Sequence, residues 1–291
     1  MSDKEGERDS GTDLDPEGYY DEFGAAEWER LDRDPVTRME FENTTDYLAE
    51  YLPDAPDAEE RSVRILDAGG AAGRYACWLA EGGYDVTLVD LSAAQVAIAR
   101  EKAAERGVAE RVTAERGDVR DLRFADDTFD AVCCLGGPLS HVVDDDERAT
   151  AMAELRRVAV PEAPVFVSVI GRLAMLRDIV TFGLDDSHGL LAPIARDGDY
   201  TAERVAEHAD GEGWAECHGF RVDEFERELE AAGFAVEKLV GLENVASRTK
   251  CELAEADDEA VESVREVVRT LREDRTAVDC SEHMLAVCRV E

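Results

Sequence analysis

Acidic residues and glycines recur where apolar runs end in the first half of the chain. Asp67 follows the apolar run at 63–66 and precedes a turn that contains Gly69, Gly70 and Gly73. The turn opens directly into a helical pattern. A strand, a glycine-rich turn and a helix in this order aim backbone N–H groups and the positive end of the helix at a ligand. The stretch therefore predicts a site for a nucleotide-like ligand.

The spacing of the glycines excludes one class of nucleotide. Dinucleotide-binding turns carry glycine at their first, third and sixth positions. Counted from Gly69, the third and sixth positions are Ala71 and Arg74. Counted from Gly70, they are Ala72 and Tyr75. The turn therefore does not fit the NAD pattern.

The same turn resembles motif I of the class I S-adenosylmethionine (SAM) dependent methyltransferases, Asp-x-Gly-x-Gly-x-Gly. The match lies at Asp67, Gly69 and Gly73, with Ala71 in the middle glycine position. The resemblance implies that these glycines, together with Gly70, let the backbone approach the methionine portion of SAM. It also implies that Asp67 orients the loop and helps to hold the SAM ammonium group.

Two more acids follow apolar segments. Asp90 ends the apolar strand pattern 85–90, about 20 residues past the first glycine, where a carboxylate can grip a ribose diol. The alternative for Asp90 is a surface acid in a very acidic protein. Asp118 follows the next strand pattern, and the resemblance implies that it accepts a hydrogen bond from the adenine amino group, beside Val119. Leu91 completes the expected cofactor contacts at this edge.

A fourth apolar run, 129–135, leads into Gly-Gly-Pro-Leu-Ser-His141. The resemblance implies that the backbone carbonyl of Leu135 binds the SAM ammonium and that acceptor contacts follow. His141 is either a general base working near neutral pH or a histidine that satisfies the start of the next helix. The loop lacks the Asp/Asn-Pro-Pro-Tyr/Phe signature of exocyclic-amine methylation, which favours a small-molecule acceptor.

Four further residues are candidates for contact with the acceptor. Tyr20 is a second catalytic candidate, and Tyr19 and Tyr20 either line the acceptor pocket or attach the N-terminal helix to the sheet. Arg172, after the fifth strand pattern, either binds an acceptor carboxylate or forms a surface ion pair. For His218 the sequence favours neither a substrate contact nor a structural role.

Strand and helix patterns alternate from residue 63 onward, which predicts βαβ units and a parallel sheet. The order resembles the class I methyltransferase fold: a Rossmann-like α/β architecture with a seven-stranded, mostly parallel sheet, helices on both faces and the last strand inserted antiparallel. We expect a disordered acidic tail at 1–15, an N-terminal helical cap at 16–58 and a SAM-binding domain at 59–291. A lid insertion is expected at about 172–220.

Composition constrains the partners and the setting. The formal net charge is −37, from 69 acidic and 32 basic residues, with lysine only at Lys4, Lys102, Lys238 and Lys250. This pattern is typical of a protein from a halophilic archaeon, although an acidic protein with a disordered tail is the alternative. The charge argues against nucleic acid as a partner. The absence of a basic–apolar signal, and of any apolar run near the roughly 20 residues a bilayer requires, predicts a cytoplasmic protein without membrane contact.

The seven cysteines include no Cys-x-x-Cys pair, which argues against a disulfide framework and a zinc site, so no metal is expected. The sequence thus predicts a SAM-dependent methyltransferase that moves a methyl group to a small molecule by direct in-line displacement, leaving S-adenosylhomocysteine. An RNA or protein methyltransferase and a non-catalytic SAM-binding regulatory protein are the alternatives. The sequence leaves open whether the protein is a monomer or a homodimer.

Overall fold

A computed structural model describes residues 14–54, 62–210 and 213–290. Its strands are β1 (Arg64–Ala68), β2 (Asp85–Asp90), β3 (Val112–Arg116), β4 (Ala131–Cys134), β5 (Pro164–Ile170), β6 (Asp199–Tyr200), β7 (Cys217–His218), β8 (Phe234–Gly241) and β9 (His283–Val290). Its α-helices are α1 (Pro16–Phe23), α2 (Ala26–Glu29), α3 (Pro35–Tyr51), α4 (Arg74–Glu81), α5 (Ala93–Glu105), α6 (Asp145–Val158), α7 (Arg172–Phe182), α8 (Leu184–Ser187), α9 (Leu191–Asp197), α10 (Ala202–His208), α11 (Val222–Ala231), α12 (Lys250–Ala254), α13 (Asp258–Leu271) and α14 (Arg275–Asp279).

Seven strands form one sheet in the order β3-β2-β1-β4-β5-β9-β8. The five strands from β3 to β5 are parallel, whereas β9 runs antiparallel to both of its neighbours. The strand order reverses between β1 and β4, and open α/β sheets bind ligands at the carboxyl ends of their strands beside such a reversal. The predicted fold class, including the antiparallel insertion of the last strand, is confirmed.

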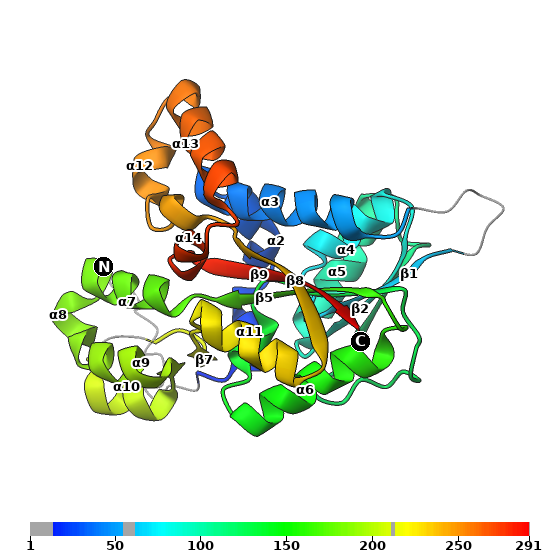
Figure 1. Ribbon diagram of the computed structural model, residues 1–291, viewed down its shortest axis with the longest axis horizontal. Helices are drawn as coiled ribbons and strands as arrows, with labels where there is room; N and C mark the ends of the chain where they lie inside the picture. Colours follow the sequence, from blue (N-terminus) through cyan, green and yellow to red (C-terminus); the bar gives the residue numbers. More distant parts are fainter. Residues whose placement is uncertain (1–13, 55–61, 211–212, 291) are drawn as a thin grey trace, which may run out of the picture.

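Helices cover both faces of the sheet (Figure 1). On one face α3, α4 and α5 contribute buried side chains such as Leu48, Leu79 and Val96. On the other face α6 and α11 contribute Leu155 and Phe225. The strands β4 and β5 are buried along almost their whole length, which is why they read as continuous apolar runs rather than alternating ones.

Local signals in the sequence set the ends of several helices. The side chains of Asp34, Ser92 and Asp144 cap α3, α5 and α6 by accepting hydrogen bonds from backbone N–H groups of the first turn. The sequence patterns predict helices at 144–158 and 172–182 and a strand at 283–290. Helix α7 and strand β9 have these bounds, and α6 begins one residue later. The strand pair β6–β7 and the short helices α8 to α10 and α12 were not predicted, because segments of two to seven residues carry too little periodicity.

The segment after β5 forms a separate small cluster at the carboxyl edge of the sheet. Helices α7 to α10 lie together on one side of the molecule (Figure 1), and their apolar residues pack around Ile194. Leu14 is buried in this cluster, and its carbonyl accepts a hydrogen bond from the N–H of Glu216. Leu14, which falls within the expected tail at 1–15, thus packs on this cluster, while residues 1–13 lie outside the described residues.

Helix α3 is joined to the C-terminal part of the chain as well as to the sheet. The Asn43 side chain donates to the carbonyl of Leu242 at 2.7 Å, and Val36 and Met39 pack against Val268 of α13. Within the described ranges, no helix is long and apolar enough to cross a membrane.

Candidate active site

A pocket with a volume of about 360 Å³ lies at the carboxyl edge of the sheet, beside the reversal of strand order. It is large enough for a small ligand, because such sites start at about 300 Å³. Its lining includes seven residues predicted to contact the cofactor: Gly69, Gly70, Asp90, Leu91, Asp118, Val119 and Leu135. Helix α1 and the segment before β7 contribute Tyr20 and Glu216. The pocket therefore joins residues from the ends of four strands, β1 to β4, and from two peripheral segments.

The turn after β1 needs its small residues. Gly69 has φ +74°, and a Cβ placed there would lie 2.4 Å from Pro138. A Cβ on Gly70 would lie 2.6 Å from a carboxylate oxygen of Asp67. Gly73, at φ +82°, is the N-cap of α4 and does not line the pocket. Ala71 holds φ +44°, a conformation that glycine adopts at lower cost, which explains physically why glycine suits this position.

Asp90 closes β2 and faces the pocket. Its Oδ2 accepts from the N–H of Ala71 and its Oδ1 from the N–H of Ser92, both at 2.9 Å. Burial raises the pKa of Asp90 to about 6, and these two N–H groups offset part of that rise. Each oxygen keeps a second lone pair for a ligand hydroxyl. The carboxylate is thus held in one orientation at the pocket wall.

Asp118 also lines the pocket, but it already has a cationic partner. The guanidinium of Arg120 donates to both of its oxygens, at 3.0 and 2.6 Å to Oδ2 and 2.9 Å to Oδ1. Burial opposes ionisation of Asp118, and the hydrogen bonds from Arg120 outweigh it, so the pKa of Asp118 is lowered. An adenine amino group at Asp118 would therefore share the carboxylate with Arg120, which also lines the pocket.

Asp67 lies beneath the turn and not in the pocket wall. It is fully buried, and the backbone N–H of Ala76 is the one group among the described residues that offers its carboxylate even a poorly aligned hydrogen bond. Burial, followed by the negative charge of Asp90, raises the pKa of Asp67 to about 7, and the Ala76 N–H offsets part of that rise. A buried carboxylate with so little compensation is costly, so a cation in the neighbouring pocket would stabilise its charged form.

His141 and Tyr20 meet at the other end of the pocket. The Nδ1 of His141 lies 2.8 Å from the backbone carbonyl of Glu216 and its Nε2 lies 3.1 Å from the hydroxyl of Tyr20. Because a carbonyl oxygen only accepts, Nδ1 carries the proton and Nε2 accepts from Tyr20. Burial lowers the pKa of His141 and raises that of Tyr20 well above its usual range. The imidazole is therefore neutral at neutral pH, with its basic nitrogen toward the pocket side.

His141 does not satisfy the start of the next helix, which was the alternative to a general base. Helix α6 is capped by Asp144, whose Oδ1 accepts from the N–H groups of Asp146 and Glu147 at 3.0 Å each. His141 instead ends a 3₁₀ turn that begins at Pro138. Gly136 and Gly137, at φ +82° and +92°, turn the chain sharply before it.

Residues 65–162 match the family model described as a methyltransferase domain. Methyltransferase GfsG of Streptomyces halstedii is 32% identical over 124 residues, which are 42% of this chain and 40% of that protein. The ubiquinone/menaquinone biosynthesis C-methyltransferase UbiE of Idiomarina loihiensis is 29% identical over 165 residues, 52% of this chain and 62% of that protein. The chain thus spans about half the length of these curated relatives.

A SAM-dependent methyltransferase structure from Methanosarcina mazei superposes with a TM-score of 0.58 at 20% identity, covering 84% of this chain and 96% of that one. Together with the strand order, this likeness decides the architecture. The fold is that of the class I methyltransferases. In this class I fold, the pocket lies where the strand order reverses, between β1 and β4. The matched segment 65–162 covers the strands from β1 to β4.

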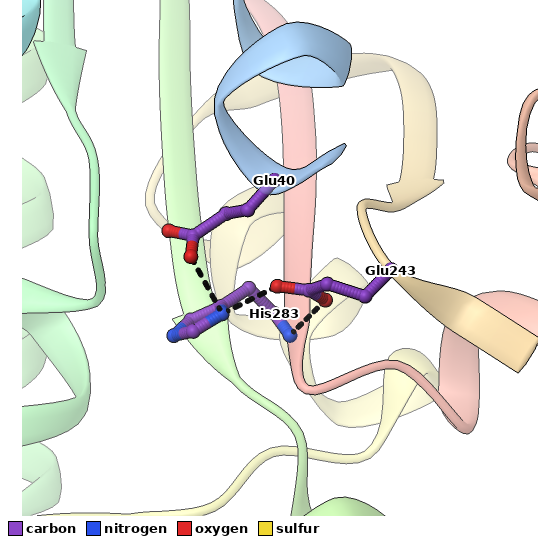
Figure 2. Close-up of side chains that lie close together, drawn as sticks. All are labelled: Glu40, Glu243 and His283. Carbon is purple, nitrogen blue, oxygen red and sulfur yellow. Dashed lines mark hydrogen bonds and ion pairs between the residues drawn. The ribbon is translucent and has the colours of Figure 1, made fainter. Parts of the chain in front are cut away.

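A buried ionic network adjoins the pocket and is connected to it through the side chain of Arg30. Arg30 lines the pocket and binds both oxygens of Glu40, at 2.7 and 3.1 Å. Figure 2 shows the imidazole of His283 between Glu40 and Glu243, with Nδ1 2.7 Å from Glu243 and 3.6 Å from Glu40. Burial opposes the charge on His283, but the two carboxylates raise its pKa to about 9. The network is thus a cation held between anions, which links α3 to β9.

Three residues predicted to contact substrate do not line the pocket. Tyr19 is partly exposed and stacks on Phe23, with ring centroids 5.9 Å apart. Arg172 is buried, where it binds the carbonyls of Gly219 and Asp197 at 2.8 and 2.9 Å. The structure therefore places Arg172 outside the pocket, with Nε and Nη2 donating to other parts of the protein rather than to an acceptor.

His218 is also absent from the pocket lining, since it is 3% exposed and its Nδ1 binds Asp199 at 2.6 Å. Conversely, Arg30, Arg120 and Glu216 line the pocket and were not predicted. Arg120 lies two residues after a predicted contact and was within reach of sequence reasoning. Arg30 and Glu216 come from segments that only the tertiary fold brings to the sheet.

Proposed function

We propose that this chain is a SAM-dependent methyltransferase that transfers a methyl group to a small molecule by direct in-line displacement. The observation that carries the proposal is the position of Asp90. Its carboxylate stands at the carboxyl end of β2, fixed by the N–H of Ala71 from the glycine-rich turn, on the wall of the same pocket as Gly69 and Leu135. If Asp90 binds the two ribose hydroxyls of SAM, the rest of the cofactor would lie along the glycine-rich turn.

The chemistry asks the protein for alignment and exclusion of water, because the sulfonium carbon is already activated. We propose that Tyr20 and His141 serve an acceptor that must lose a proton as it attacks. The neutral Nε2 of His141 would take that proton, either directly or through the Tyr20 hydroxyl that now donates to it. Asp90 and Asp118 would be occupied by ribose and adenine.

A small-molecule acceptor is supported by two observations. One relative is named a C-methyltransferase of ubiquinone and menaquinone biosynthesis, which fits a small-molecule acceptor. The formal net charge of −37 opposes binding to nucleic acid phosphates. A protein or RNA acceptor and a non-catalytic SAM-binding role remain the alternatives. Incubation with methyl-labelled SAM and a fractionated lysate tests them: label in a small-molecule fraction supports the proposal, and label only in macromolecules, or none, contradicts it.

The affinity for S-adenosylhomocysteine should rise with pH. Asp67 and Asp90 have pKa values raised to about 7 and about 6, so both gain protons as pH falls toward 5. The ligand carries an ammonium group and ribose hydroxyls, which favour the charged carboxylates, so binding must displace those protons at low pH. Calorimetry between pH 5 and 8 should show affinity falling by up to about tenfold per pH unit between pH 7 and 6, where Asp67 gains its proton, and more steeply below pH 6, where Asp90 gains one too.

The variant Asp67→Asn is the control for this pH dependence. It keeps the side-chain volume and removes the group with the higher pKa, so its affinity should change less between pH 6 and 7.5. An affinity in the wild type that stays flat or rises toward pH 5 would contradict the assignment of a cationic ligand to this site.

We also propose that the protein works in a salt-rich cytoplasm, as its composition suggests. Its carboxylates repel one another at low salt, and at molar salt the Debye length falls to about 3 Å, which removes most of this repulsion. The melting temperature should therefore rise between 0.1 and 2 M KCl. A melting temperature that is constant or falls over this range would contradict the halophilic assignment.

A further inference from the structure

A second polar cluster lies away from the pocket, where β7 meets α11. Its centre is the imidazole of His218, whose side chain is 4% exposed. The Nδ1 atom lies 2.6 Å from Oδ1 of Asp199, so Nδ1–H donates to this carboxylate. Nε2 is buried and has no hydrogen-bond partner among the described residues. A buried ring nitrogen without a partner is costly and requires an explanation.

Two glutamates face that nitrogen. Glu224 and Glu228 lie four positions apart on α11 and therefore share one face of the helix. Oε1 of Glu224 lies 3.7 Å from Nε2 of His218, which is too long for a hydrogen bond. One donor atom each from His218, Glu224 and Glu228 lie within 4.8 Å of one another. The three side chains thus converge on one point.

The surrounding contacts leave these donors available. Glu224 binds Arg172 through its other oxygen, Oε2, at 2.5 Å, so Oε1 has no other partner in the described structure. Arg148 donates to both oxygens of Glu228, at 2.9 and 3.2 Å, and each oxygen keeps a second lone pair. Histidines that bind a metal through one ring nitrogen usually donate the N–H of the other to a carboxylate, as Nδ1 of His218 does to Asp199.

We propose that His218, Glu224 and Glu228 bind a divalent transition-metal ion such as Zn²⁺, with Asp199 orienting the histidine. Ligand atoms about 2.0–2.2 Å from such an ion stand roughly 3.4 Å apart in a tetrahedral site, so the two glutamates must move inward slightly. Both are partly exposed, at 24% and 30%, and have room to turn. The lack of cysteine pairs does not bear on this site, because its donors are nitrogen and oxygen.

Such an ion would connect two parts of the molecule. Asp199 belongs to β6 and His218 to β7, the strand pair beside α9 and α10, whereas both glutamates belong to α11, which packs on the sheet. The ion would hold the segment after β5 against the sheet. The alternative occupant is a proton on Nε2, which would form an ion pair with Glu224 and need no metal. The two alternatives are distinguished by measuring metal uptake: a metal site takes up one ion for each chain, and a protonated histidine takes up none.

The test is calorimetric titration of the full chain with Zn²⁺ after dialysis against a chelator, at pH 8 and in 2 M KCl to screen the acidic surface. The wild type should take up one tight equivalent and melt at a higher temperature with Zn²⁺ than without it. His218→Gln should lose that equivalent. Asp199→Asn should bind about 10–100-fold more weakly, the usual effect of removing such an orienting group.

His208→Gln is the matched control. His208 Nε2 also lies 3.7 Å from a glutamate, Glu207, on the surface helix α10, and it is outside the proposed site. This variant should retain the tight equivalent. Binding of S-adenosylhomocysteine is measured on the same samples. If the wild type binds it, retained binding in a variant shows that the variant is folded, and loss of Zn²⁺ uptake in that variant then concerns the metal site alone. If the wild type does not bind it, the proposed function fails while the metal test still stands. If the wild type shows no saturable uptake, or if His218→Gln and Asp199→Asn bind Zn²⁺ as the wild type does, the metal site is refuted.

Discussion

Replacing His141 by glutamine should lower methyl transfer by about 10²–10⁴-fold, the contribution of a well-placed general base. Glutamine can keep hydrogen bonds to Tyr20 and to the carbonyl of Glu216, but it cannot take up a proton. The affinity for S-adenosylhomocysteine should stay within a few-fold, because Asp90 and the glycine-rich turn are untouched. Turnover of the acceptor found with labelled SAM, and calorimetry with the product, measure the two effects.

The variant Tyr20→Phe separates two routes for the proton. It removes the hydroxyl that donates to Nε2 and keeps the ring. If the acceptor proton passes through this hydroxyl, Tyr20→Phe should be nearly as slow as His141→Gln. If His141 takes the proton directly, only the glutamine variant should be slow. Near wild-type turnover in His141→Gln would show that His141 only positions the acceptor, and an already deprotonated nucleophile would then be required.

Asp90→Ala should weaken binding of SAM and S-adenosylhomocysteine by about 1.5–3 kcal/mol, the cost of losing hydrogen bonds to a charged group. This corresponds to a rise in Kd of roughly 10–150-fold. The change also leaves the N–H groups of Ala71 and Ser92 without their acceptor, which adds to the loss. Calorimetry with both ligands measures the effect.

Asp85→Ala is the matched control, since Asp85 begins the same strand that Asp90 ends. Asp85 pairs with Arg111 at 3.0 Å on the surface at the opposite edge of the sheet. This variant should bind S-adenosylhomocysteine as the wild type does. Equal affinity in the wild type and in Asp90→Ala would remove the main support for a ribose contact at this position.

The fold was predictable because its signals are local. Strands such as β4 and β5 are nearly continuous apolar runs, and helices such as α6 begin at a capping acid. The cofactor side of the pocket was predictable for a related reason: the carboxyl ends of parallel strands meet at one edge, so Asp90, Asp118 and Leu135 had to converge.

The acceptor side was less predictable, because its residues come from segments that are distant in sequence. Nothing near Arg30 indicates that it reaches the pocket, and nothing near His283 indicates Glu40 and Glu243 as partners. For Arg172 the sequence left an acceptor contact and a surface ion pair open, because an arginine after a strand looks the same whether it faces a ligand, a carboxylate or a backbone carbonyl. Such choices depend on tertiary contacts that a single sequence does not display.

The most direct test of the account is calorimetric titration of the wild-type chain with S-adenosylhomocysteine and, separately, with NAD⁺, both in 2 M KCl at pH 7.5. The glycine-rich turn with Asp90 predicts saturable binding of one equivalent of S-adenosylhomocysteine and no binding of NAD⁺. Binding of NAD⁺ without binding of S-adenosylhomocysteine would contradict the assignment of this pocket to SAM.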